Sequence, residues 1–395
     1  MTAPRRFVCV HGHFYQPPRE NPWIEAIEVQ ESAAPFHDWN ERIDAECYGP
    51  NAAARVLDDA GRIVRLADNY SRISFNVGPT LLSWLERKAP STYEAILEAD
   101  RASIRRFGRG SAMAQAYGHA ILPLCNDRDR RTQVAWGIAD FRRRFARDPE
   151  GMWLPETAVD TPSLETLAEF GIRYTVLAPS QARRFRAIGA TAWSSGAIDP
   201  RVPYRVALPS GRQIAVFFYD GAASRAVAFE RLLDDGASFV ARIRSGFDDR
   251  DDTQLVHLAT DGESYGHHHR FGEMALAFAL DRLDASDDVT LTNYAAFLDA
   301  HPPAHDTEIV ERTAWSCAHG VGRWTDDCGC RTGAHPTWSQ GWRRPLREAL
   351  DEVRDAIAPE WERRAGSLLR SPWEARDAYV EVVLDRSPER TGRFL

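Results

Sequence analysis

The sequence predicts an α/β fold in which a barrel of parallel strands and crossover helices is followed by a smaller helical C-terminal domain. Short runs of apolar and β-branched residues alternate with helical segments from the N-terminus to about residue 300. Strands that alternate with helices form parallel sheets, and the seven or eight strands expected here suggest closure into a barrel. The 395 residues suffice for a barrel of roughly 250 residues and a second unit. We therefore assign residues 1–300 to a barrel domain and residues 301–395 to a helical domain.

The expected elements of the barrel follow one another at short intervals. The strands are predicted at 7–10, 73–77, 112–116, 152–154, 174–177, 214–219, 255–259 and 289–292. Between them, amphipathic or charged segments at 52–67, 131–145, 164–170 and 274–283 are expected to form the connecting layer.

The chain changes character beyond residue 301. Residues 315–342, which we call the collar, are rich in Trp, Gly, His and Cys. Residues 347–365 and 373–384 carry helical charge patterning and little strand signal. We expect an irregular collar followed by helices.

Composition excludes several classes of function. The net charge of −8 argues against a nucleic-acid partner, which usually requires a basic face. No segment approaches about 18 consecutive apolar residues, and residues 1–6 lack the apolar stretch of a signal peptide, so we expect a soluble, cytoplasmic protein without a membrane partner. Lys88 is the one lysine of the chain, and it lies in a charged helix end. Schiff-base chemistry and a phosphate-loop lysine are therefore set aside.

The six cysteines are too sparse to crosslink a chain of this length, and free thiols are expected. The collar holds a group rich in sulfur and nitrogen, namely Cys317, His319, Cys328, Cys330 and His335. Paired zinc ligands usually follow a Cys-x2–4-Cys spacing, which Cys328 and Cys330 do not match. We therefore expect no metal and no other cofactor, and predict that His319 and Trp324 contact substrate.

Polar side chains follow several predicted strands where each strand ends. The carboxyl ends of parallel barrel strands gather on one face, which is where active sites of such barrels lie. The side chains expected there are His11, His13 and Gln16 after the first strand, His119 after the third, Trp153 and Glu156 at the fourth, and Asp261, Glu263, His267 and His268 after the seventh. Successive side chains diverge, so His267, His268 and His269 cannot all face inward, and the first two are favoured.

Two separated carboxylates in one barrel mouth indicate glycosidic chemistry. One carboxylate attacks or activates water while the other protonates the leaving oxygen. Histidines donate hydrogen bonds to hydroxyl groups, and tryptophans offer flat apolar faces to sugar rings.

These residues also carry a resemblance to a known family. His11-Gly-His-Phe-Tyr-Gln-Pro17 resembles the first motif of glycoside hydrolase family 57, although Phe14 and Tyr15 lie between His13 and Gln16. The segments 119–124, 153–156 and 260–268 are similar to its second, third and fourth motifs and keep the same order. The region 315–324 matches the usual fifth motif poorly, so the chain resembles a subgroup with its own uncharacterised helical C-terminal extension.

The resemblance implies a (β/α)7 barrel, a retaining mechanism on α-glucans and no metal. It places Glu156 at the nucleophile position and Asp261 at the general acid/base position. The ten side chains that would line the substrate site are His11, His13, Gln16, His119, Trp153, Glu263, His267, His268, His319 and Trp324. Retaining enzymes hold the two carboxyl groups about 5 to 5.5 Å apart, which we expect for Glu156 and Asp261.

Three alternatives stay open on sequence alone. Hydrolysis, branching and 4-α-glucan transfer differ only in the group that attacks the glycosyl-enzyme. A metal-dependent hydrolase of the amidohydrolase or deacetylase type would use His11 and His13 as ligands. A non-catalytic glycan-binding barrel would bind without turnover.

Overall fold

The computed structural model describes residues 5–58, 60–330, 335 and 337–394. Within these residues seven parallel strands form a ring, in the order β11, β1, β4, β5, β6, β7 and β10. The ring closes between β10 and β11, where the backbone N–H of Asp220 donates to the carbonyl of His257 at 2.8 Å. The strands are β1 (Arg6–Phe14), β4 (Ser74–Val77), β5 (Ala114–Gln115), β6 (Met152–Trp153), β7 (Tyr174–Leu177), β10 (Gln213–Phe218) and β11 (Gln254–Asp261). The predicted barrel is confirmed.

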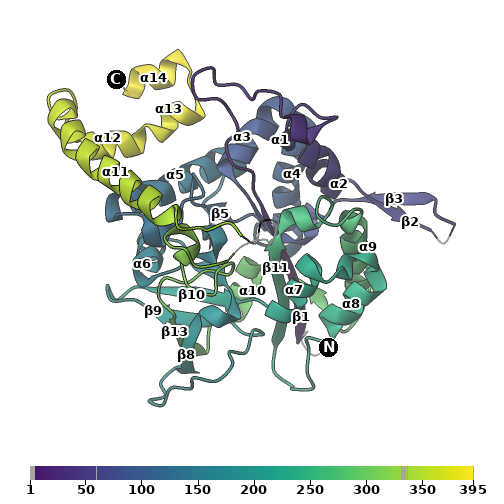
Figure 1. Ribbon diagram of the computed structural model, residues 1–395. Coiled ribbons are helices and arrows are strands. Elements are labelled where there is room, and N and C mark those ends of the chain that lie inside the picture. Colours follow the sequence, from purple (N-terminus) through teal and green to yellow (C-terminus); the bar gives the residue numbers. More distant parts are fainter. Residues whose placement is uncertain (1–4, 59, 331–334, 336, 395) are drawn as a thin grey trace.

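Helices surround the ring (Figure 1). Asn126, Asp160 and Asp220 cap the N-termini of α5, α6 and α7, where their side chains accept backbone N–H groups of the first turn. The helices up to residue 300 are α1 (Trp39–Ile43), α2 (Gly49–Ala52), α3 (Pro79–Lys88), α4 (Pro90–Phe107), α5 (Asp127–Phe145), α6 (Thr161–Glu169), α7 (Gly221–Phe229), α8 (Gly236–Arg244), α9 (Gly272–Asp284) and α10 (Tyr294–Ala300).

Strand β1 is longer than the sequence predicts. It pairs with β11 as far as His13, which lies opposite Asp261, and with β4 from His11 to Phe14. His11 and His13 therefore lie inside the strand and not after it, because neighbours on both sides keep the polar residues extended. The eighth predicted strand becomes β12 (Thr290–Leu291), which pairs with the start of β1 at Phe7 and Val8.

The expectation of a helical or charged connecting segment at 52–67 is wrong. These residues form a hairpin of β2 (Ala54–Leu57) and β3 (Ile63–Ala67) that projects from the body of the molecule (Figure 1). The β-branched residues Val56, Ile63 and Val64 favour extended backbone and explain this outcome.

A second group of strands extends the barrel beside β10. β9 (Tyr204–Ala207) pairs antiparallel with β10, and β13 (His305–Ile309) lies between β9 and β8 (Ala182–Ala187). The chain just beyond residue 300 thus returns to a sheet shared with the barrel, and the division at residue 300 stays a prediction.

The C-terminal part is helical, as predicted. Its helices are α11 (Arg343–Ala365), α12 (Pro372–Ala378), α13 (Val380–Leu384) and α14 (Pro388–Phe394). They lie beside α5 (Figure 1), where Trp136 Nε1 donates to the carbonyl of Asp377 at 2.9 Å and Arg376 pairs with Asp129 at 2.8 Å. Among the described residues, no helix is long and apolar enough to cross a membrane.

Candidate active site

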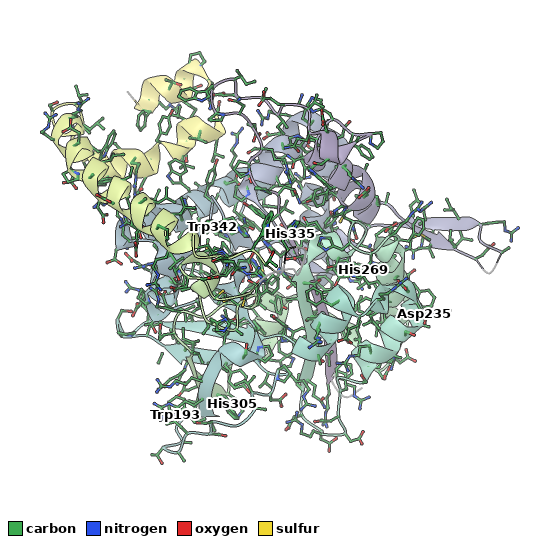
Figure 2. All side chains as sticks on the ribbon, in the orientation of Figure 1. Trp193, Asp235, His269, His305, His335 and Trp342 are labelled. Carbon is green, nitrogen blue, oxygen red and sulfur yellow. The ribbon has the colours of Figure 1, made fainter. Side chains whose placement is uncertain are left out.

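The predicted site residues gather at the carboxyl ends of the barrel strands. Figure 2 shows His335 and Trp342 of the collar on this side of the barrel, whereas His305 and Trp193 lie at the far end of the β8–β13 sheet. The collar reaches the strand ends, because its residues Trp315 and Ser316 contact Glu156, which follows β6.

Glu156 follows β6 in a tight turn of unusual backbone conformation. Glu156 has φ of 58° and Thr157 has φ of 49°, both in the left-handed region that L-residues rarely adopt. Such residues cost roughly 1–3 kcal/mol each and persist where neighbours fix them. Gln181 supplies this support, because its amide accepts from Thr157 Oγ1 at 2.9 Å and donates to the Thr157 carbonyl at 2.8 Å. The turn thereby aims Glu156 in one direction.

Two collar residues donate hydrogen bonds to the Glu156 carboxylate. Ser316 Oγ donates to Oε2 at 2.5 Å, and Trp315 Nε1 donates to the same oxygen at 3.1 Å. The Trp315 ring also packs edge-on against Trp153, with centroids 5.2 Å apart. The two donors restrict the position of the Glu156 carboxylate. Neither residue was predicted from the sequence, although both lie at the start of the region 315–324, which matches the fifth motif poorly.

Asp261 ends β11 and lies next to His13 across the strand pair. Solvent reaches its side chain, and yet burial among protein atoms raises its pKa to about 6, with a further contribution from the negative charge of Glu156. The charge of Glu156 thus acts on Asp261, while the immediate surroundings of the two carboxyl groups differ.

Five aromatic rings form a stack across the barrel mouth, in the order Tyr15, His119, His13, Trp153 and His11. Successive centroids lie 3.7, 5.2, 5.2 and 4.8 Å apart, and the planes are tilted by at most 21°. Burial lowers the pKa of His119 to about 4 and that of His11 to about 3, and lowers the pKa of His13 well below its usual value. All three imidazoles are thus neutral near pH 7 and act as hydrogen-bonding groups, not as cations.

Asn76 of β4 fixes the orientation of the two β1 histidines. Its Oδ1 lies 3.1 Å from His11 Nε2, and its Nδ2 donates to His13 Nδ1 at 2.8 Å. Because His13 Nδ1 accepts this hydrogen bond, the neutral ring carries its hydrogen on Nε2, which lies 3.1 Å from His119 Nε2. His13 therefore donates to His119. The polar alternation of Ser74 and Asn76 within an apolar strand was the signal that could have revealed this support.

Glu263 and Gln16 are buried behind the mouth. Glu263 Oε1 accepts from Tyr48 Oη at 2.6 Å and from the backbone of Tyr15 at 3.1 Å, and burial raises its pKa to about 7. Gln16 accepts from Arg19 at 2.6 Å. These contacts favour a role in holding the end of β1, and direct substrate contact by either residue stays a prediction.

The three histidines of the fourth motif have different surroundings. His267 Nδ1 lies 2.5 Å from Glu46 Oε2, and His269 Nε2 donates to the Ala228 carbonyl at 3.1 Å. His268 is exposed. Glu46 thus holds His267, and contact of either His267 or His268 with a substrate stays a prediction.

The collar brings His319 close to cysteines. Its Nδ1 lies 3.4 Å from Cys330 Sγ, and the predicted substrate contact by His319 stays untested, as does that by the half-buried Trp324. Among the described residues, the group of side chains arranged to hold a metal ion is Cys317, His319, Cys328 and Cys330. His11 and His13 are outside it, and both ring nitrogens of His11 face Ser74 and Asn76. The geometry thus gives the His-x-His metal hydrolase no support.

Comparison with known proteins identifies the family. The model of glycosyl hydrolase family 57 matches residues 14–306, and the chain belongs to this family. A domain of unknown function (DUF3536) matches residues 338–395, which coincide with the C-terminal helices and the end of the collar.

Individual relatives are distant and longer. Alpha-amylase 1 of Dictyoglomus thermophilum is 31% identical over 98 residues, which are 25% of this chain and 13% of that protein. An alpha-amylase of Pyrococcus horikoshii is 22% identical over 241 residues, or 59% of this chain and 34% of that protein. The chain thus spans about a third or less of these curated relatives.

Solved structures share the fold at low identity. An exo-type maltose-forming amylase from Pyrococcus sp. ST04 superposes with a TM-score of 0.71 at 17% identity, covering 98% of this chain and 68% of that one. A branching enzyme of the same family from Thermococcus kodakaraensis gives a TM-score of 0.56 at 17% identity, covering 81% and 76%.

Proposed function

We propose that this protein is a retaining glycoside hydrolase or transglycosidase that acts on α-glucans by double displacement. The observation that carries the proposal is the unlike environment of two carboxyl groups at one barrel mouth. Glu156 accepts hydrogen bonds from Trp315 and Ser316, whereas burial and the charge of Glu156 keep a proton on Asp261 up to about pH 6. The general acid of a retaining enzyme must carry a proton when the substrate binds, and the raised pKa of Asp261 supports that role.

The reaction follows from these roles. The Glu156 carboxylate attacks the anomeric carbon, and the bond to the leaving oxygen breaks as Asp261 gives that oxygen its proton. Asp261, now ionised, takes a proton from water or from an acceptor hydroxyl, which attacks the glycosyl-enzyme and releases Glu156. The carboxyl separation of about 5 to 5.5 Å remains a prediction of this mechanism.

The ring stack supports binding of a sugar. Tyr15 and His119 lie at its half-buried outer end. There the Tyr15 hydroxyl and the neutral His119 ring can hydrogen-bond to a sugar, and an aromatic face can pack against a pyranose ring. Trp153 and His11 are fully buried, so we assign them to the support of the stack.

The choice between hydrolysis and transfer is tested by product analysis. The relatives' names include both amylases and a branching enzyme. Proton NMR after incubation with maltooligosaccharides, amylose and glycogen separates the outcomes: shorter chains indicate hydrolysis, a redistribution of chain lengths indicates transfer, and new α-1,6 signals indicate branching. No change in any α-glucan would contradict the proposal.

The pH profile tests the role of Asp261. Its raised pKa means that the carboxyl group is protonated below about pH 6 and loses the proton above it. We therefore expect kcat/KM on an unactivated maltooligosaccharide to fall about tenfold per pH unit above that pKa, because the general acid is lost. The decline should be weak on an aryl α-glycoside with a good leaving group. A rate that keeps rising to pH 8 on the unactivated substrate would exclude Asp261 as the acid.

Removing the hydrogen bond from Ser316 to Glu156 tests whether this donor contributes to the reaction of the proposed nucleophile. Ser316→Ala removes a donor to a charged acceptor, an interaction worth about 1.5–3 kcal/mol, so kcat/KM should fall roughly 10- to 100-fold. Ser210→Ala is the matched control, because Ser210 Oγ donates in the same way to Glu165, at 2.6 Å, on the turn before β10. The control should keep wild-type activity. Equal activity of both variants would show that Ser316 contributes nothing to the reaction.

A further inference from the structure

The collar gathers four side chains whose ligating atoms are typical of zinc sites. Cys317 is buried, Cys328 and Cys330 are half-buried, and His319 is exposed. All six cysteines of the chain are free thiols. A metal was not expected from the sequence because of the Cys-x-Cys spacing. Spacing along the chain does not show whether the pairs Cys317/His319 and Cys328/Cys330 meet in space.

The distances within this cluster are close to those of a tetrahedral site. The three Sγ atoms and a ring nitrogen of His319 lie within 4.8 Å of one another, with Cys317 Sγ 3.9 Å from Cys328 Sγ and Cys330 Sγ 3.4 Å from His319 Nδ1. Zinc bonds of about 2.3 Å to sulfur and 2.0–2.1 Å to nitrogen place tetrahedral ligand atoms roughly 3.5 to 3.8 Å apart. Three thiolates and one imidazole complete the coordination of a structural zinc ion.

Neighbouring polar groups support the cluster from outside. Gln340 Nε2 donates to the carbonyl of Cys330 at 2.8 Å. Arg343 at the start of α11 donates to Gln340 Oε1 at 2.9 Å and lies 3.9 Å from Cys328 Sγ. Zn²⁺ with three thiolates would carry one net negative charge, which the Arg343 guanidinium beside Cys328 would offset.

We propose that Cys317, His319, Cys328 and Cys330 bind one structural zinc ion that holds residues 317–330 of the collar in one conformation. The ligand Cys317 directly follows Trp315 and Ser316, the two donors to Glu156. A fixed Cys317 therefore restricts the position of both donors. This consequence for activity rests on the proposed function, whereas zinc binding does not.

Metal content is the direct test. The full chain, produced without a polyhistidine tag and purified under reducing conditions, should contain one zinc per chain by inductively coupled plasma mass spectrometry. X-ray absorption at the zinc edge should show three sulfur ligands and one nitrogen ligand. A folded wild-type chain that lacks zinc, takes up none when Zn²⁺ is added, or carries a Cys317–Cys328 disulfide would overturn the proposal.

Variants assign the ligands. The double variant Cys328→Ser/Cys330→Ser should lose zinc, whereas Cys125→Ser, which changes a half-buried cysteine outside the cluster, should retain it. Zinc that persists at full stoichiometry in the double variant would refute the assignment. If the double variant does not fold, the absorption spectrum of the wild-type protein decides, because it reports the ligand set without mutation.

Activity separates this inference from the proposed function. Stripping zinc from the wild-type chain with a mercurial reagent, followed by thiol regeneration and chelation, should lower kcat/KM roughly tenfold or more, and added Zn²⁺ should restore it. Bound zinc without α-glucan turnover would leave the metal site intact and defeat the proposed function. Turnover of α-glucans by a protein that binds no zinc would support the proposed function and refute the metal site.

Discussion

Glu156→Ala is expected to lower turnover of α-glucans by a factor of roughly 10⁴ or more, because no other group replaces the nucleophile. The deleted carboxylate leaves a space on the side from which it would attack. Azide is small enough to enter it, and a single displacement by azide forms a glycosyl azide with inverted anomeric configuration. Activity on a substrate with a good leaving group should therefore return with added azide, and NMR should show the inverted product.

Glu169 offers a matched control for the Glu156 variant. Glu169→Ala removes an exposed glutamate of α6 that pairs with Arg131, and it should keep wild-type activity. Azide that restores Asp261→Ala with inversion and leaves Glu156→Ala inactive would reverse the two assigned roles.

Asp261→Ala is expected to show a loss that depends on the leaving group. Without the general acid, cleavage of natural glucans should fall about 10²- to 10⁴-fold, the usual contribution of such proton transfer. Substrates whose leaving group needs little protonation should lose much less, and any azide product should keep the original configuration, because azide then attacks the glycosyl-enzyme. Comparing kcat/KM on maltooligosaccharides and aryl α-glycosides measures the difference.

The exposed residue Asp252, before β11, supplies the control for the second variant. Asp252→Ala should leave both substrate classes unaffected. A uniform loss on all substrates in Asp261→Ala would point to a role in binding or folding instead of proton transfer. Wild-type rates in both carboxylate variants would place the site elsewhere.

Much of the barrel could be predicted from local sequence. The runs 174–177 and 255–259 are apolar except for Thr175 and His257. They form the buried strands β7 and β11. The hairpin at 52–67 was missed because its charged residues resemble a helix surface, while Val56, Ile63 and Val64 carry the weaker strand signal.

The candidate site could be predicted only in part. Glu156 and Asp261 follow strands, and the carboxyl ends of parallel strands meet, so their gathering follows from the fold. The donors Trp315 and Ser316 are 159 and 160 residues away from Glu156 in the chain. No spacing rule links such distant segments. The collar cluster was visible in the sequence as a group, but the spacing did not show that the pairs Cys317/His319 and Cys328/Cys330 meet in space.

Trapping of the covalent intermediate tests the central claim most directly. A 5-fluoro-α-glucosyl fluoride has a good leaving group and an electron-poor ring, so the glycosyl-enzyme forms quickly and breaks down slowly. Digestion and mass spectrometry should find the sugar on the peptide that contains Glu156, with one sugar per chain and loss of activity in proportion. A sugar attached to Asp261, or a protein that turns over natural α-glucans with inversion and without any covalent adduct, would contradict double displacement through Glu156.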